Sequence, residues 1–352
     1  MLDVVALVLG GVAVIATGLS LLRARAWWIR IWDFPRLQVA LLGIVALALA
    51  AIDGSLDWPA TGLAGLLTVA VVFQVALVWR YTRLAPREVQ RNQHDERERQ
   101  VSLVVSNVLQ TNRQADRLLA VVHDCDPDLV LCVETDDWWE KRLDALMTTH
   151  RHVVRRPLPN TYGMLLYSRL PLEEPEVNFL VEPDIPSIQA RVRLGDGTRV
   201  WLNCVHPRPP VPGESDESLE RDAELLLVGK RVRDAELPVI VCGDLNDVAW
   251  SRTTRLFQKV SRLVDPRKGR GFYSTFHARW PGFRYPLDHV FHSDDFRLVS
   301  MGRLGNVGSD HFPVYVHLSH EPEATAEQDA PEESAEDMRE AQETIAEEKA
   351  SE

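Results

Sequence analysis

The chain has 352 residues, which is long enough for two domains of ordinary size, and a formal net charge of −12 at pH 7. Residues 321–352 contain 13 Asp or Glu and 2 Lys or Arg, so this segment carries −11 of that charge and the remaining chain only −1. The overall acidity therefore excludes no class of ligand for the rest of the chain. The segment has no aromatic residue and is rich in Glu and Ala, which predicts an acidic, disordered tail, with a helix formed on a partner as the alternative.

Three segments near the amino terminus are almost free of charge: Leu2–Leu22, Leu37–Ile52 and Ala60–Trp79. At 1.5 Å per residue the first and third can cross a hydrocarbon core of about 30 Å, while the middle one is short. A cleaved signal peptide is disfavoured because the first residues carry no positive charge and two more apolar segments follow. We therefore expect residues 1–82 to be a membrane anchor of three transmembrane helices, with buried helices of a soluble domain as the alternative.

The charges between these segments predict an orientation. The first loop and the region after the third segment are rich in arginine, whereas the second loop has only Asp53 and Asp57. Because positively charged loops stay in the cytoplasm, the carboxy-terminal region is expected to be cytoplasmic and the protein a multi-pass protein of the cell membrane. Residues 83–100 are expected to form a charged linker or a helical stalk. The four cysteines form no C-x-x-C pair, and three lie in apolar runs, which favours a reducing compartment.

From Val101 onward, short apolar runs with the length of β-strands alternate with stretches of helical periodicity. The strand-like runs are 101–108, 128–134, 163–168, 188–194, 199–206, 238–244, 287–293 and 313–318. The helical stretches are 114–123, 137–147, 217–233 and 253–262. This order predicts a layered α/β domain over residues 101–320.

Polar side chains recur where the apolar runs begin or stop. These residues are Asn107, Glu134, His206, Asp244, Asn246, Asp288, Asp310 and His311. One such residue is ordinary turn or cap chemistry, but so many suggest that the strand ends meet at one rim. Carboxylate and amide oxygens in one place suit Mg²⁺ or Mn²⁺ rather than tetrahedral zinc.

The motifs that hold these residues are similar to those of the endonuclease/exonuclease/phosphatase superfamily, the fold of DNase I. They are, in chain order, Ser106–Asn107, Val133–Thr135, Gly243–Asn246, Leu287–Val290 and Ser309–His311. The resemblance covers the domain and neither the anchor nor the tail. It implies a four-layer sandwich of two mixed β-sheets flanked by helices.

The resemblance also implies roles for the residues at the rim. Glu134, Asn107 and Asp310 correspond to metal ligands; the alternatives are a helix N-terminal carboxylate for Glu134 and a turn for Asn107. Asp244 corresponds to the residue that orients or deprotonates the attacking water, and Asn246 to a hydrogen-bond donor to the phosphoryl group. A simple turn is the alternative for this Gly-Asp-Leu-Asn sequence.

Five further residues complete the expected site. His311 would contact the phosphate, with Asp288 holding its imidazole in one tautomer, and His206 would also meet the phosphate. Asn160 and Tyr162 correspond to a region that often contacts substrate, although ordinary turn chemistry explains this loop equally well. The Pro-rich sequence after His206 departs from the usual family pattern and resembles a bacterial, membrane-linked branch of the superfamily.

These expectations describe a membrane-anchored, divalent-metal-dependent phosphoesterase that hydrolyses phosphodiester or phosphomonoester bonds by metal-activated water attack. Its partners would be the lipid bilayer and a phosphoester, which is a nucleic acid, a lipid headgroup or a small molecule; no obligate protein partner is evident. The alternatives are a strict DNA or RNA nuclease and a catalytically silent scaffold that recruits partners through the acidic tail. Basic loop residues near the rim either contact phosphates or are solvated.

Overall fold

The computed structural model describes residues 2–53 and 58–351. The chain divides into two compact units, which are considered separately below. We call Met1–Pro86 together with Pro210–Ser218 the helical unit, and Arg87–Pro209 together with Leu219–Glu352 the α/β unit.

The helical unit contains two helices that are long and apolar enough to cross a membrane, α1 (Leu2–Leu21) and α4 (Trp58–Trp79). Between them lie α2 (Trp27–Arg30), the 3-10 helix η1 (Ile31–Asp33) and α3 (Arg36–Asp53). The segments Trp27–Asp33 and Arg36–Ile52 meet at 72°, so they qualify as a span only when taken as one bent pair. Pro35 lies at the bend, where it cannot donate a backbone hydrogen bond. The unit thus offers two or three membrane spans; the expected loop residue Asp57 lies outside the described residues.

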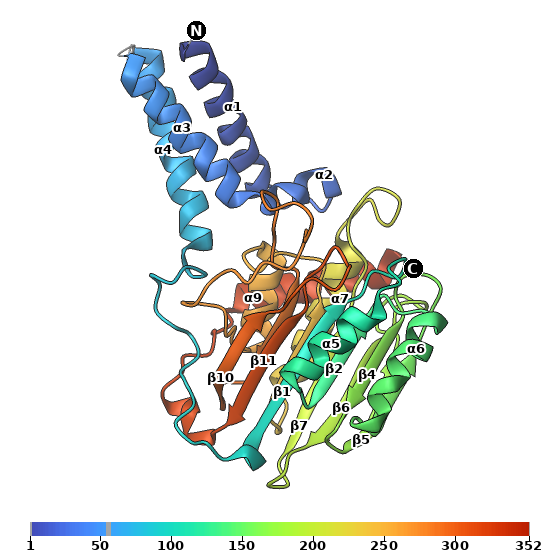
Figure 1. The fold of residues 1–352 in the computed structure, drawn as a ribbon. Coiled ribbons are helices and arrows are strands. Elements are labelled where there is room, and N and C mark those ends of the chain that lie inside the picture. Colours follow the sequence, from blue (N-terminus) through green and yellow to red (C-terminus); the bar gives the residue numbers. More distant parts are fainter. Residues whose placement is uncertain (1, 54–57, 352) are drawn as a thin grey trace. The chain divides into compact units, whose positions relative to one another are not determined.

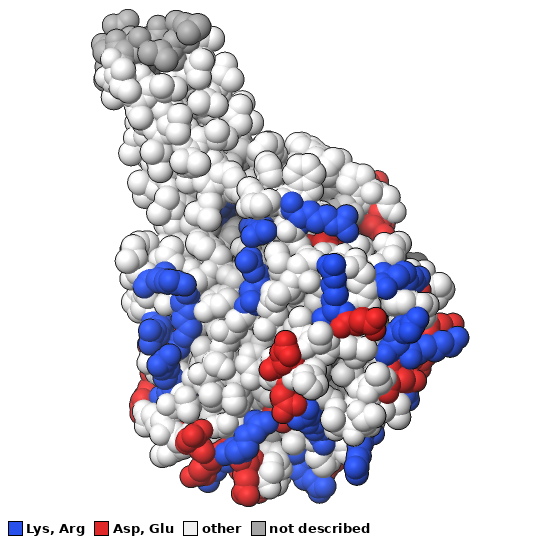
Figure 2. Space-filling view, in the orientation of Figure 1, with Lys and Arg blue, Asp and Glu red and all other residues white. Residues whose placement is uncertain are grey.

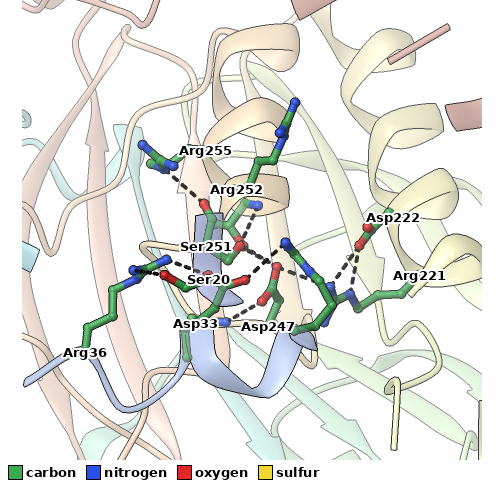
Figure 3. Close-up of polar contacts among 12 residues, drawn as sticks. Ser20, Asp33, Arg36, Arg221, Asp222, Asp247, Ser251, Arg252 and Arg255 are labelled. Carbon is green, nitrogen blue, oxygen red and sulfur yellow. Dashed lines mark hydrogen bonds and ion pairs between the residues drawn. The ribbon is translucent and has the colours of Figure 1, made fainter. Parts of the chain in front are cut away.

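Polar side chains connect the three long helices of the helical unit. Arg36 at the start of α3 donates to Gln74 Oε1 of α4 at 2.9 Å and pairs with Asp33. Gln74 in turn donates to Thr17 Oγ1 of α1 at 2.9 Å. Figure 3 shows Asp33 and Arg36 beside Ser20, to whose hydroxyl Arg36 also donates. Because each of these bonds is made inside the unit, the polar groups are compatible with apolar surroundings.

The α/β unit contains two β-sheets packed face to face with helices outside them (Figure 1). The first sheet has the order β10-β11-β1-β2-β4-β3, with strands β10 (Phe296–Arg303), β11 (Val314–His320), β1 (Gln100–Asn107), β2 (Leu129–Val133), β4 (Met164–Ser168) and β3 (His152–Arg156). The second has the order β5-β6-β7-β8-β9, with strands β5 (Leu172–Asn178), β6 (Ser187–Arg193), β7 (Arg199–Val205), β8 (Val239–Asp244) and β9 (Asp288–His292). Both sheets are mixed, as expected.

Helices cover the outer face of each sheet. The first carries α5 (Ala115–Cys125), α6 (Asp137–Leu143) and the 3-10 helix η3 (Asp144–Thr148), and the second carries α7 (Leu219–Arg233) and α8 (Arg252–Ser261). In β2, Leu129 and Leu131 face the core between the sheets while Val130 and Cys132 pack against α5 and α6. Strands covered on both faces are continuously apolar, which explains the sequence runs. The predicted four-layer sandwich is confirmed.

Strand direction brings the ends of several strands to one rim. β1 and β2 run parallel, as do β7 and β8, so their carboxyl ends lie at the same edge of each sheet. β11 is antiparallel to β1 and β9 is antiparallel to β8, so these two strands begin at that edge. The polar residues after β1, β2, β7 and β8 and those before β9 and β11 are thereby placed on a common side.

From Arg87 onward, the expected linker is part of the α/β unit. Val89 is fully buried in the core between the sheets, and Arg91 forms a β-bridge with Leu298 of β10. Glu88 pairs with Lys268 at 2.8 Å. Except for a single 3-10 turn, η2 (Arg97–Arg99), residues 87–99 are not helical. The prediction of a separate charged linker or helical stalk is wrong for residues 87–99, because the buried Val89 and the Glu88–Lys268 pair join this segment to the α/β unit.

The acidic tail is also folded through residue 351. After the 3-10 helix η4 (Pro322–Ala326), helix α9 (Ala335–Ser351) packs Ala341 and Ile345 against residues of α7 and α8. Asp337 and Glu340 pair with Lys259 and Arg252 of α8. The prediction of a disordered tail is wrong here because Met338, Ala341 and Ile345 form an apolar stripe at helical spacing, which average composition conceals.

Candidate active site

Asn107 joins two carboxylates at the rim of the α/β unit. Its side-chain nitrogen donates to Glu134 Oε1 at 2.7 Å and to Asp244 Oδ2 at 2.9 Å. Asn107 ends β1, Glu134 follows β2, and Asp244 ends β8, so the three come from both sheets. Asn107 and Asp244 are almost completely buried. Burial raises the pKa of Glu134 to about 7, because its hydrogen bond from Asn107 and the nearby His311 only partly offset the loss of water.

The backbone conformation of Gly243 and Asn246 positions the side chains of Asp244 and Asn246 at the rim. Gly243 has φ of 147°, and a Cβ there would lie 1.8 Å from the carbonyl oxygen of Val205 in β7, so only glycine fits. Asn246 adopts the left-handed region with φ of 51°, which asparagine tolerates better than most residues. Its backbone N–H donates to Asp244 Oδ1 at 2.9 Å, and its side-chain amide donates to the carbonyl of Pro207 at 2.9 Å. The turn therefore orients the carboxylate of Asp244.

His311 lies between two carboxylates. Its Nδ1 is 2.8 Å from Asp288 Oδ2, and its Nε2 is 3.6 Å from Asp244 Oδ2. Burial favours the neutral ring, but the charges of Asp288 and Asp244 outweigh it and raise the pKa of His311 to about 10. At neutral pH the imidazole is thus protonated, with Nδ1–H donating to Asp288 and Nε2–H directed toward Asp244.

His206 and Tyr162 flank this group. Burial lowers the pKa of His206 to about 4, so its ring is neutral at neutral pH. Its Nδ1 is buried, and among the described residues it has no hydrogen-bond partner. The ring of Tyr162 lies 5.5 Å from that of His206, centroid to centroid. Two ring groups from separate loops therefore line the same side of the rim.

Of the two other expected residues, Asp310 lies beside this cluster, whereas Asn160 makes its hydrogen bonds with Asp184 and Tyr162. The charge of Asp310 contributes to the pKa of both Glu134 and His311, which places its carboxylate beside the cluster, and its Oδ1 accepts from Ser309 Oγ at 3.3 Å. The side chain of Asn160 instead donates to the carbonyl of Asp184 at 3.1 Å and accepts from the backbone of Tyr162. Asn160 therefore shapes its own loop.

Two sets of side chains at the rim offer metal ligands. Ligand atoms of Asp244, Asp288 and His311 lie within 4.8 Å of one another. A protonated imidazole has no free lone pair, however, and the ring nitrogens of His311 already face carboxylates. Glu134 is a partly buried carboxylate that accepts hydrogen bonds from neutral N–H donors, those of Asn107 and Gln110. The carboxylate oxygens of Glu134 therefore fit a hard divalent cation better than the group of Asp244, Asp288 and His311 does.

Sequence reasoning did not identify the contacts that hold the loop after Asp244. Arg221 of α7 donates to the backbone carbonyl of Asn246 at 2.8 Å, and His289 Nε2 lies 2.9 Å from the carbonyl oxygen of Asp247. Arg267 is 2.7 Å from His289 Nδ1, so the guanidinium donates to Nδ1 and the proton of His289 sits on Nε2. Figure 3 shows Arg221 with Asp222 and Asp247 with Ser251. No motif marks Arg221 or Arg267, since both act through contacts distant in sequence.

Several basic residues expected near the rim are committed to carboxylates. The pairs are Arg155–Asp144, Arg208–Glu182, Arg252–Glu340, Arg267–Asp265 and Lys268–Glu88. These cations are engaged within the α/β unit, so they do not form a continuous positive surface for phosphates.

Solved structures share this fold. D. rerio TDP2 complexed with a single-strand DNA product matches with a TM-score of 0.53 and 17% identity, covering 62% of this chain and 99% of that one. The human nocturnin catalytic domain with bound sulfate matches with a TM-score of 0.52 and 17% identity, covering 64% and 96%. An endonuclease/exonuclease/phosphatase from Beutenbergia cavernae gives 0.52 and 19%, covering 63% and 72%. No curated protein matches the sequence.

The family model of the endonuclease/exonuclease/phosphatase family matches residues 104–311, from the middle of β1 to the histidine of the Ser-Asp-His motif. The resemblance to a membrane-linked branch stays a prediction. The match spans more than half of the chain and every strand-end motif, and the chain belongs to the endonuclease/exonuclease/phosphatase family.

Proposed function

We propose that this protein is a membrane-anchored, Mg²⁺-dependent phosphoesterase that hydrolyses a phosphodiester or phosphomonoester by attack of water. Its family generally hydrolyses phosphoesters. The observation that carries the proposal is the bridge of Asn107 between Glu134 and Asp244, beside the His311–Asp288 pair. Five buried or nearly buried polar groups from separate strands have no structural need to meet at one rim, whereas phosphoryl transfer needs such a set.

Glu134, with Asp310 and Asn107 beside it, would hold the metal ion. When bound, a divalent ion neutralises charge on the phosphoryl oxygens and favours deprotonation of a water molecule. Burial raises the pKa of Glu134 to about 7, and a divalent ion bound to this carboxylate would offset that effect of burial. Hard oxygen donors favour Mg²⁺ or Mn²⁺. Asn107 Oδ1 accepts a hydrogen bond from the backbone N–H of Leu109, so Asn107 would hold the ion only by sharing that oxygen.

Each of the remaining residues would have one role: accepting the proton of the attacking water, donating a hydrogen bond to the phosphate, or holding a residue that does so. Asp244 would accept a proton from the attacking water, oriented by the backbone N–H of Asn246. Protonated His311 would donate from Nε2 to the phosphate, while Asp288 keeps the ring in place through Nδ1. Neutral His206 would donate a hydrogen bond without adding charge, and the second amide hydrogen of Asn246 would reach a phosphoryl oxygen.

A strict nuclease is the second candidate. The observation that favours it is the likeness to D. rerio TDP2, whose structure contains a single-strand DNA product. On the face shown in Figure 2, Lys and Arg of the α/β unit lie in separate groups, several of them beside Asp and Glu. Binding that depends on counterion release needs a denser basic surface. The scaffold alternative is less well supported. It required the acidic tail to recruit partners, whereas α9 in that tail packs on its own domain.

A panel of phosphoesters tests the proposed function. The full-length protein, purified in detergent, is incubated with plasmid, oligonucleotides, phosphoinositides, sphingomyelin and sugar phosphates. Hydrolysis of at least one class is expected with Mg²⁺ or Mn²⁺, complete loss in EDTA, and recovery when metal is restored. Activity that persists in EDTA, or no hydrolysis of any class with either metal, would refute the proposal.

We place the α/β unit in the cytoplasm. The support is the arginine-rich sequence on both sides of the candidate spans, Arg23–Arg36 and Arg80–Arg91, against an arginine-free second loop. A reporter fused after the last residue is expected to be active only in its cytoplasmic form. A reporter that is active only outside the cytoplasm contradicts this orientation.

A further inference from the structure

A short hairpin is fastened directly to the Ser-Asp-His motif. Phe276 forms β-bridges with both Tyr285 and His311, and its ring lies 5.0 Å from the imidazole of His311, centroid to centroid. The backbone N–H of Ala278 donates to the carbonyl of Asp310 at 2.6 Å. We call residues 276–285 the aromatic hairpin. Because it shares hydrogen bonds with the motif, its position relative to His311 is set by backbone contacts.

The tip of the aromatic hairpin exposes two large apolar side chains. Trp280 is 62% exposed and Phe283 is 58% exposed, more than any other large hydrophobic side chain described in the α/β unit. The tip is nevertheless ordered by its own bonds: Trp280 N–H donates to His277 O at 3.2 Å, and Phe283 N–H donates to Trp280 O at 3.0 Å. Exposed aromatic groups on a rigid turn beside a reaction centre indicate a contact surface.

The flanking charges and the chain connection point to a lipid bilayer as the partner. Arg279 and Arg284 lie on either side of the two aromatic residues, and Arg284 is held over the ring of Phe312 at 5.1 Å. Trp and Phe favour the headgroup boundary, and arginine favours the anionic headgroups of the cytoplasmic leaflet. Only seven residues, 80–86, separate α4, a candidate span, from Arg87, the first residue of the α/β unit, and seven residues reach at most about 25 Å.

A nucleic-acid platform fits these observations less well. Stacking proteins combine aromatic groups with a positive groove that follows the phosphate backbone. Here many arginines near the rim are paired with carboxylates, and the chain outside residues 321–352 carries a net charge of only −1. The two exposed rings lie on one turn and not along a charged track.

We infer that the aromatic hairpin enters the headgroup region of the bilayer and presents the phosphoester of a membrane lipid to His311. This inference rests on the proposed function for the reaction and on the aromatic hairpin for the substrate class. The substrate is therefore a lipid phosphoester that reaches the site from the membrane surface.

The position of the hairpin is tested without any activity measurement. Full-length Phe283→Cys is labelled with an environment-sensitive fluorophore and reconstituted into vesicles containing anionic lipid, with Cys125→Ser present to remove the half-buried native thiol. Met147→Cys, which is 41% exposed elsewhere on the α/β unit, is the matched control. Nitroxide lipids are expected to quench the label at 283 several-fold more than the label at 147. Iodide in the aqueous phase is expected to quench the label at 147 more than the label at 283. Equal iodide access at both positions overturns the inference.

Activity then tests the substrate class. Full-length Trp280→Ser/Phe283→Ser is expected to hydrolyse vesicle-embedded phospholipid about tenfold more slowly than the parent, as loss of about 1.4 kcal/mol of interfacial contact implies. Its rate on a soluble nitrophenyl phosphodiester should be unchanged. A loss restricted to oligonucleotides overturns the inference in favour of base stacking. If the label lies in the bilayer but no phosphoester is hydrolysed, the proposed function fails while the membrane contact stands.

Discussion

Asp244→Asn is expected to lower kcat by a factor of about 10² to 10⁴, the range that a positioned general base contributes. The substitution keeps the side chain's size and its hydrogen bond from the backbone of Asn246, but the amide accepts no proton from water. It also puts N–H donors beside those of Asn107, so one of the two amides must turn. The measurement is steady-state hydrolysis of the panel's best substrate by full-length protein.

Asp126→Asn is the matched control. Asp126 lies before β2, at the end of that strand remote from Glu134, and its carboxylate is exposed and paired with Arg169. This variant should retain full activity, and near-ultraviolet circular dichroism should show both variants folded. His311→Gln should fall in the same range as Asp244→Asn, since it removes the cation between Asp244 and Asp288. Activity of Asp244→Asn within twofold of the parent would disprove the role given to this residue.

Glu134→Gln is expected to raise the Mg²⁺ concentration for half-maximal activity by at least about tenfold, because the amide supplies no charge to a hard cation. Asp288→Asn should lower kcat without moving the metal dependence, because Asp288 is bonded to His311 Nδ1. The two variants thereby separate the alternative ligand sets at the rim. They are compared by titrating each full-length variant with Mg²⁺ and by isothermal calorimetry of the metal alone.

The opposite pattern would assign the metal elsewhere. If Asp288→Asn abolishes metal binding and Glu134→Gln does not, the group of Asp244, Asp288 and His311 holds the ion. The role of Glu134 would then be limited to its hydrogen bond with Asn107.

Part of the fold follows from local pattern. Strands such as β2 and β8 were predictable because they are covered on both faces, so that almost every residue in them is apolar. The sheet-edge strands β3, β5 and β10 were not among the predicted runs. Prediction failed where a segment was judged by its average composition. Helix α9 is stabilised by an apolar stripe of three residues within a strongly acidic segment. Val89 belongs to a charged segment, yet its side chain lies in the core. In both places a few buried side chains outweigh the surrounding composition.

The candidate site shows the same division. The motifs identify Asn107, Glu134, Asp244, Asp288 and His311 because residue type and position at strand ends suffice to mark them. They do not reveal that the amide of Asn107 bridges two carboxylates, or that Arg221 and His289 hold the carbonyls after Asp244. Such contacts join residues more than twenty positions apart, and no spacing rule encodes them.

The amino-acid sequence alone is sufficient to establish the layered α/β class, two strongly apolar candidate spans and the polar residues of the rim, since hydrophobic periodicity and short motifs are local properties. Tertiary structure decides which of those polar groups are hydrogen-bonded to one another and which basic residues are already paired. It also decides that the hairpin carrying the exposed Trp280 and Phe283 is joined to His311 through Phe276. The physical reason is that strand direction and register bring distant residues together, and burial then sets their charge.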